Sequence, residues 1–249
     1  MSNSLKIIVP FYNPGEFLET CVATIMSQKH DNYKVIFIDD ASTDNSWDLL
    51  PHDDDRAICI RNEKNVTALP NLHMAIMDHC DPDDIVCIVD GDDWLPHKKV
   101  LKFIDDYYTE HNCWVTYGQA RWTDGRRGFA THYTERDFNR IRKSVSDFKI
   151  SHLRTFRAGA YQILKEQDSD FSCLKDNNGE FYKMTYDVAI MLPLLEVSGF
   201  SRVKFINEIL YTYNRDNPIS DDKKNQALQT GIHIEILSKP PFKRVEKYK

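Results

Sequence analysis

The stretch Ile85-Val86-Cys87-Ile88-Val89-Asp90-Gly91-Asp92-Asp93-Trp94 decides the fold of this 249-residue chain. Its first five residues are apolar and do not alternate with polar ones, which is typical of a strand buried on both faces of a sheet. Three carboxylates follow where the strand ends. Carboxylates this close repel one another, and a divalent cation with oxygen ligands relieves that repulsion. An acidic turn is the competing interpretation, because Asp and Gly are also common in turns.

Two earlier segments repeat this arrangement of an apolar run that ends in turn-forming or acidic residues. Residues 5–10 run into Phe11-Tyr12-Asn13-Pro14-Gly15, and residues 34–38 run into Asp39-Asp40. A helix is expected after each run, from about Glu16 and around Trp47. Further strands are expected at 57–60, 85–89 and 114–117, and further helices near Pro70 and from Pro96. The alternation predicts an α/β fold with a doubly wound, mostly parallel sheet, whose acidic strand ends share the edge where ligands bind.

The second half of the sequence is less regular. Residues 129–150 mix charged and aromatic residues without a clear period and predict a loop or lid, whereas 151–164 predict a helix. A further helix is expected to begin at Thr185-Tyr186-Asp187 and to end at Gly199. The last expected elements are short strands at 200–205 and 209–213, a polar loop and a helix from about 222 to 237.

The composition of the chain excludes some partners and locations. The net charge of −6 and the pI near 5.8 give no global basic field, so nucleic acid is not an expected partner. No apolar run is long enough to cross a bilayer and no signal-type segment opens the chain, so we expect a cytoplasmic protein. The basic end, residues 238–249, is expected to be flexible and to make at most weak contact with anionic lipid. The six cysteines show no C-x-x-C spacing, which favours reduced thiols.

Three motifs occur in a characteristic order: Val9-Pro10-Phe11-Tyr12-Asn13, Ile38-Asp39-Asp40-Ala41-Ser42-Thr43-Asp44 and Val89-Asp90-Gly91-Asp92-Asp93. Together with a later acidic residue that opens a helix, they resemble glycosyltransferase family 2, the inverting enzymes with the GT-A fold. The likeness extends over roughly residues 5–220, and an ordered set of motifs is more specific than one D-x-D. This sequence departs from the family pattern twice. Val66 or Thr67 stands where glycine is common, and Tyr186-Asp187 stands for the usual Glu-Asp pair.

The resemblance implies transfer of a sugar, with inversion, from a nucleotide-sugar donor, here a UDP-sugar. The acceptor is expected to be a hydroxyl of a glycan or of a lipid-linked or protein-linked substrate. Residues 1–118 would form the nucleotide-sugar-binding half of one GT-A domain, residues 119–237 its acceptor-binding half, and residues 238–249 the tail. The family's Q-x-x-R-W motif is absent, which argues against a processive polysaccharide synthase.

The same resemblance assigns candidate site residues. Asp92, with Asp90, would hold Mn2+ or Mg2+, whose positive charge stabilises a departing diphosphate. Asp187 would be the general base on the acceptor side. The donor-binding candidates are Pro10, Tyr12, Asn13, Asp39, Asp40, Asn71, Asp90, Gly91 and Arg215. The candidates for acceptor or phosphate contacts are Asp93, Trp94, His152, Arg154 and Ser220. For each aspartate, capping of a helix or turn is the alternative role.

Three other classes of protein combine a parallel sheet with paired aspartates or a nucleotide site. A nucleotidyltransferase would carry a Gly-rich phosphate loop with a basic residue after the first strand, which residues 11–15 lack. A response-receiver domain would be much shorter than this chain. A non-catalytic sugar-nucleotide-binding module would share the same donor site, so the sequence leaves that alternative open.

Overall fold

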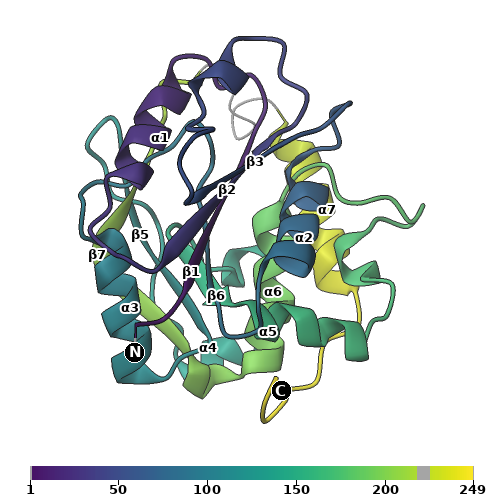
Figure 1. Cartoon of the computed structure of the whole chain (residues 1–249). Helices are drawn as coiled ribbons and strands as arrows, with labels where there is room; N and C mark the ends of the chain where they lie inside the picture. The colour runs from purple at the N-terminus through teal and green to yellow at the C-terminus, as the bar shows by residue number, and fades with distance from the viewer. Residues whose placement is uncertain (1, 218–224, 249) are drawn as a thin grey trace.

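A single seven-stranded sheet runs through the molecule (Figure 1). The computed structural model describes residues 2–217 and 225–248. The strand order is β3-β2-β1-β4-β6-β5-β7, and β6 runs antiparallel to both of its neighbours while the other pairs are parallel. The strands are β1 Leu5–Phe11, β2 Tyr33–Asp39, β3 Ala57–Arg61, β4 Ile85–Ile88, β5 Val115–Trp122, β6 Arg154–Arg157 and β7 Val203–Tyr213.

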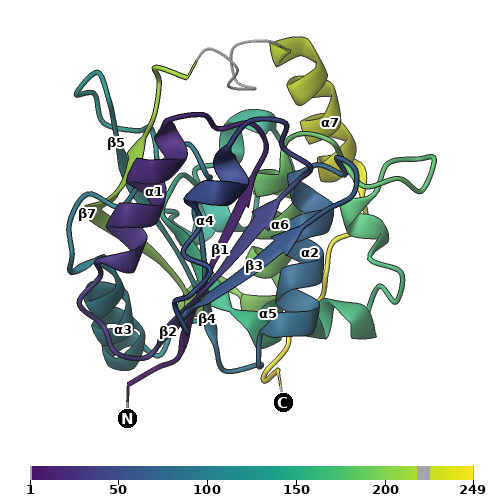
Figure 2. The ribbon, with the colours of Figure 1, turned by 45° about the horizontal axis from the view of Figure 1, so that its top comes forward.

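Helices cover both faces of this sheet. The α-helices are α1 Phe17–Met26, α2 Ala68–His79, α3 Val100–His111, α4 Glu135–Phe138, α5 Ala158–Gln162, α6 Tyr186–Ser198 and α7 Gln226–Ser238. Helices α1 and α3 pack on one face, and α2, α5, α6 and α7 lie on the other (Figure 2). Helix α6 is buried over most of its surface, which explains why residues 188–195 are apolar on every side of the helix. The expected α/β architecture is confirmed.

The second half differs from the expectation in three places. Residues 154–157 form strand β6 ahead of α5, where one helix was expected over 151–164. One strand, β7, replaces the two short strands, because an irregularity in its pairing with β5 accommodates the polar residues 207–208. Residues 129–150 contain α4 and bury Phe138, Ile141 and Phe148, so this segment packs on the core.

The tail expected to be flexible lies against the domain. The amide of Val245 donates to the carbonyl of Val197 over 3.0 Å, and Phe242 N donates to Glu196 Oε2 over 3.0 Å. Tyr248 packs edge-on against Trp114, with ring centroids 4.8 Å apart. The basic composition suggested a solvated end, but the apolar residues spaced among the charges anchor it. No described helix is both long and apolar enough to cross a membrane.

Candidate active site

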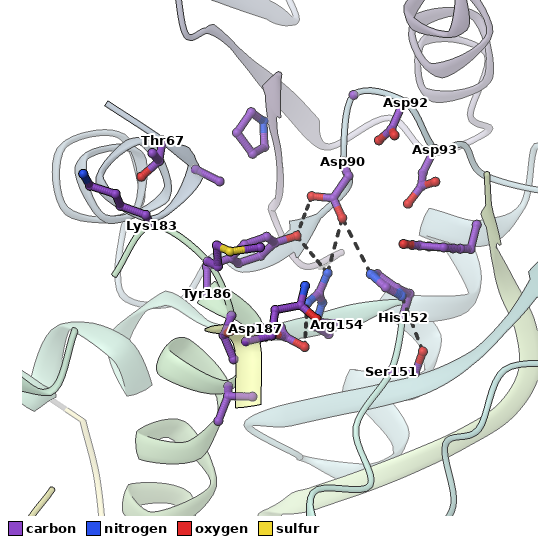
Figure 3. Close-up of a pocket in the computed structure, with 18 of the residues that line it drawn as sticks. Thr67, Asp90, Asp92, Asp93, Ser151, His152, Arg154, Lys183, Tyr186 and Asp187 are labelled. Carbon is purple, nitrogen blue, oxygen red and sulfur yellow. Dashed lines mark hydrogen bonds and ion pairs between the residues drawn. The ribbon is translucent and has the colours of Figure 1, made fainter. Parts of the chain in front are cut away.

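A cavity of about 1010 Å³ opens at the sheet edge where β1 and β4 end. Residues from both halves of the chain line this cavity: Asp90 follows β4, and Asp187 lies in the first turn of α6. Most of the residues singled out from the sequence line it: Pro10, Tyr12, Asp40, Asn71, Asp90, Gly91, Asp92, Asp93, His152, Arg154, Asp187 and Arg215. Figure 3 shows Asp92 and Asp187 on opposite sides of Asp90.

Asp90 is the centre of a polar network in this cavity. Its Oδ1 accepts a hydrogen bond of 2.5 Å from the Tyr186 hydroxyl, and its Oδ2 lies 3.5 Å from Arg154 Nη2 and 3.6 Å from His152 Nε2 (Figure 3). Burial alone would raise the pKa of Asp90, but His152, Arg154 and Tyr186 outweigh it and lower that pKa. Asp90 is therefore held as a carboxylate.

Arg154 connects Asp90 to the proposed base. Its guanidinium is 3% exposed, donates to the Tyr186 hydroxyl over 3.0 Å and lies 3.8 Å from Asp187 Oδ2. Burial opposes its charge, but Tyr186, Asp90 and Asp187 raise the pKa of Arg154 overall. Burial and the charge of Arg154 together lower the pKa of His152, against the opposing effect of Asp90. Arg154 is thus the buried cation that balances this group of carboxylates.

The Asp92-Asp93 pair divides into a half-buried and a fully buried carboxylate. Asp93 is 1% exposed, and its oxygens accept from the Tyr211 hydroxyl and from Asn214 N, each over 2.7 Å. Asp92 lines the cavity, and its Oδ2 accepts a 2.7 Å bond from the Asn217 amide. Asp93 therefore holds the loop, whereas Asp92 holds the Asn217 amide at the cavity surface.

The residues present fit a divalent cation. Burial, and then the nearby charges of Asp92 and Asp90, raise the pKa of Asp93 well above its ordinary value. Ligand atoms of Asp90, Asp93 and His152 also lie within 4.8 Å of one another. Carboxylate oxygens suit Mg2+ or Mn2+. Asp90 would hold such an ion, with Asp93 and His152 in reach of the same point, and the expected ligand Asp92 lines the same cavity.

Three of the sequence candidates do not line the cavity. Asn13 Oδ1 accepts from Thr43 N over 2.7 Å, and Asp39, fully buried, accepts from Ser42 N over 2.7 Å and lies 3.1 Å from Arg61 Nε. The backbone of Trp94 pairs with Thr212 on β7. These contacts shape the loops behind the cavity wall, and direct ligand contacts of these three residues stay a prediction. Ser220 lies outside the described residues.

Asp40 has a structural task besides lining the cavity. Its carboxylate accepts from Val66 N over 2.9 Å, from Thr67 N over 2.8 Å and from the Asn62 amide over 2.8 Å. These bonds hold Thr67 at φ 74° and ψ 171°, a region that is essentially restricted to glycine. This is the position where the sequence departs from its expected glycine, so the backbone keeps the glycine conformation despite the threonine.

Sequence reasoning missed the aromatic hydroxyls that organise the site. Tyr186 bonds to Asp90, and Tyr211, whose hydroxyl accepts from Asp90 N over 3.1 Å, also bonds to Asp93. In the sequence, Tyr186 stood out only because it occupies the position of an expected glutamate. Tyr211 had no feature that distinguished it from other residues of a strand. Asn217, which holds Asp92, stood in the polar loop already expected near the site.

Comparison with known proteins agrees with this geometry. Residues 6–167 match the family described as glycosyl transferase family 2. Glycosyltransferase GlyG of Streptococcus pneumoniae serotype 4 is 26% identical over 227 residues, which are 86% of this chain and 72% of GlyG. The S. aureus TarS 1–349 structure in complex with UDP-GlcNAc matches with a TM-score of 0.61 and 18% identity, over 85% of this chain and 58% of that chain.

A second solved structure has the same fold. The mannosyltransferase PcManGT from Pyrobaculum calidifontis, in complex with GDP-Man and Mn2+, matches with a TM-score of 0.57 and 16% identity, over 86% of this chain and 57% of that chain. This chain thus spans less than two thirds of either solved chain. The fold is thus an α/β fold of the GT-A type. The chain belongs to glycosyl transferase family 2, which removes the nucleotidyltransferase and response-receiver alternatives.

Proposed function

We propose that this chain is an inverting, metal-dependent glycosyltransferase that moves a sugar from a UDP-sugar to an acceptor hydroxyl. One observation carries the proposal: Asp92 and Asp187 line the same cavity from opposite sides of Asp90 (Figure 3). Inversion needs the leaving diphosphate and the base on opposite faces of the sugar, and this arrangement allows both. The UDP-GlcNAc complex of the TarS relative supports a uridine donor, and the Mn2+ complex of PcManGT supports a metal.

The residues of the chain have separate tasks in this reaction. Asp187 accepts the proton of the acceptor hydroxyl while the oxygen of that hydroxyl forms the new bond to the anomeric carbon. The bond from that carbon to the diphosphate oxygen breaks, and UDP leaves with the bonding electrons. Asp92 and Asp90 would hold a divalent ion, which would supply Lewis-acid stabilisation of the diphosphate. Arg154, 3.8 Å from Asp187 Oδ2, orients the base.

Asp187→Asn tests the assignment of the base. Asparagine cannot accept the proton, so we expect kcat to fall by about 10²- to 10⁴-fold, the usual contribution of a general base. The affinity for UDP with Mn2+, measured by calorimetry, should stay close to that of the native protein, because Asp187 lies away from Asp92 (Figure 3).

A screen of nucleotide sugars for metal-dependent release of the nucleotide identifies the donor for this assay. Loss of UDP affinity in Asp187→Asn would contradict the assignment of Asp187 as the general base. Tight UDP binding with no release from any donor would instead indicate the non-catalytic binding module.

A further inference from the structure

The tyrosine next to the proposed base makes a contact that the reaction described above does not use. Tyr186 is the first residue of α6, and Asp187 follows it in the same turn. The Tyr186 hydroxyl donates to Asp90 Oδ1 over 2.5 Å and accepts from Arg154 Nη2 over 3.0 Å (Figure 3). Asp90 and Tyr186 are 96 positions apart in the sequence. This side chain therefore ties the helix that carries the base to the residue that follows β4.

The first turn of α6 begins without a capping side chain. Thr185, at the N-cap position, has φ 61° and makes no side-chain capping hydrogen bond with any described residue. The first amide groups of a helix have no partner within the helix, and a missing cap leaves this end less stable. Asp187 Oδ2 lies 3.8 Å from Arg154 Nη1, which is beyond hydrogen-bond distance. The bond from Tyr186 to Asp90 thus anchors an uncapped turn.

Asp90 depends less on this bond than α6 does. Its Oδ2 lies 3.5 Å from Arg154 Nη2 and 3.6 Å from His152 Nε2, and its backbone amide donates to the Tyr211 hydroxyl over 3.1 Å. These three contacts would remain if the Tyr186 hydroxyl were removed. Loss of that hydroxyl should therefore release the start of α6 while Asp90 stays in place.

A hydroxyl and a carboxylate would act differently at position 186, where the sequence has tyrosine instead of the expected glutamate. Asp90 and Asp187 already lie beside the one buried guanidinium of Arg154. A glutamate would add a third carboxylate to this group and repel the other two. The Tyr186 hydroxyl instead donates one hydrogen bond and accepts another without adding charge.

We infer that Tyr186 is a positioning residue for the base: its hydroxyl fixes the first turn of α6, and with it Asp187, relative to Asp90. The inference rests on the proposed function and adds to it a residue that acts through Asp187. A displacement of about 1 Å can cost about 10²-fold in rate, because proton transfer requires hydrogen-bond distance. Tyr186 therefore sets the rate of transfer and leaves the affinity for the donor nearly unchanged.

Tyr186→Phe removes the hydroxyl and keeps the ring, whose centroid lies 5.1 Å from Arg154 Cζ. Release of UDP from the donor found by screening gives kcat and KM, and calorimetry with UDP and Mn2+ gives Kd and the number of functional sites. We expect kcat per functional site to fall about ten- to hundredfold, the range for one lost hydrogen bond to a charged group. KM for the donor and Kd for UDP should stay within about threefold of the native values.

Amide hydrogen exchange tests the anchoring of α6 without substrate. The amides of Val188 and Ala189 both donate to the Thr185 carbonyl over 3.2 Å, so their exchange rates report opening of the first turn. Both amides should exchange several times faster in Tyr186→Phe than in the native protein.

Tyr33→Phe is the matched control. The Tyr33 side chain is also buried, and its hydroxyl also accepts from an arginine, Arg56 Nη1 over 2.5 Å, while it donates to the Ile25 carbonyl over 3.2 Å. Tyr33 is not among the described residues that line the cavity. This variant should keep the native kcat per functional site and the native exchange rates at the start of α6.

A combined variant tests whether Tyr186 acts through the base. In the Asp187→Asn background no base remains to be positioned, so adding Tyr186→Phe should lower the residual rate by less than about twofold. A further tenfold loss in that background would show that Tyr186 acts independently of Asp187 and would overturn the inference.

Two other results would overturn the inference while leaving the proposed function intact. One is a kcat per functional site in Tyr186→Phe within about twofold of native. The other is a loss of UDP affinity as large as the loss of kcat, which would make Tyr186 a donor-binding residue. Absence of UDP release from every donor by the native protein would instead overturn the proposed function, and the positioning role with it.

Discussion

Replacing Arg154 by glutamine removes the buried cation of the site. In the folded protein its guanidinium is 3% exposed and lies 3.5 Å from Asp90 Oδ2 and 3.8 Å from Asp187 Oδ2. Breaking a buried pair costs about 3–5 kcal/mol, because an uncompensated charge remains. Since the Asp187 side chain is 38% exposed and can be hydrated, we expect the lower end, about 3 kcal/mol.

The expected loss is large enough to measure without substrate. For a chain of this size, 1 kcal/mol shifts the melting temperature by about 2–4 °C, so Arg154→Gln should melt about 6–12 °C below the native protein. Circular dichroism in chelator, without nucleotide, isolates the effect from ligand binding. Arg140→Gln, an exposed arginine, should change the free energy of unfolding by less than about 0.5 kcal/mol.

A double-mutant cycle with Asp90→Asn identifies the partner. If Arg154 compensates Asp90, the two substitutions together cost less than their sum, with a coupling free energy of about 1–3 kcal/mol. Strict additivity, or a melting temperature of Arg154→Gln within about 2 °C of native, would refute the assignment of Arg154 as the balancing cation.

Three further substitutions test separate parts of the structure. Asp92→Ala should abolish the dependence of UDP affinity on Mn2+, measured by calorimetry, and equal UDP binding by the native protein in chelator would contradict the metal site. Thr67→Gly should raise the melting temperature, because about 1–3 kcal/mol of backbone strain exceeds the 0.5–1 kcal/mol entropy cost of glycine; a lower melting temperature would show that Asp40 holds no strain there. Tyr248→Ala should cost about 2 kcal/mol, roughly half the value for a fully buried aromatic, and a tail that moves freely would show no change on thermal unfolding.

The parallel half of the fold was predictable because its strands are buried on both faces. Continuous apolar runs such as 35–38 and 85–89 have few alternative interpretations, and β2 and β4 cover nearly all of their residues. Carboxylates after such runs must then meet at one edge, as Asp40 and Asp92 do in the cavity wall.

Which carboxylate faces the ligand was not predictable from the sequence. Asp39 and Asp40 are adjacent, yet Asp39 pairs with Arg61 behind the wall while Asp40 lines the cavity. Neighbouring residues of an extended chain point in opposite directions, so a one-residue shift in where the strand ends exchanges their roles. Asp92 and Asp93 both line the cavity in the turn that follows β4, and there it is the oxygens of Asp93 that hold the loop.

The direction of one short strand determines which arginine reaches the acidic edge. Strand β6 has the sequence Arg154-Thr155-Phe156-Arg157, with an arginine at each end. Because β6 runs antiparallel to β4, Arg154 pairs with Ile88, beside Asp90, whereas Arg157 pairs with Ile85 at the other edge. There Arg157 donates to the Asp83 carbonyl over 2.6 Å.

A parallel β6 would exchange the two arginines over about 10 Å, the rise of three residues in a strand. The charge pattern of this segment is the same read in either direction, so composition and periodicity carry no information about its orientation. The antiparallel pairing of β6 with β4 determines the orientation of the segment. It thereby places Arg154 between Asp90 and Asp187, which share its positive charge. The balance of charge at the site is therefore set by topology, at the one strand that the sequence pattern had indicated as a helix.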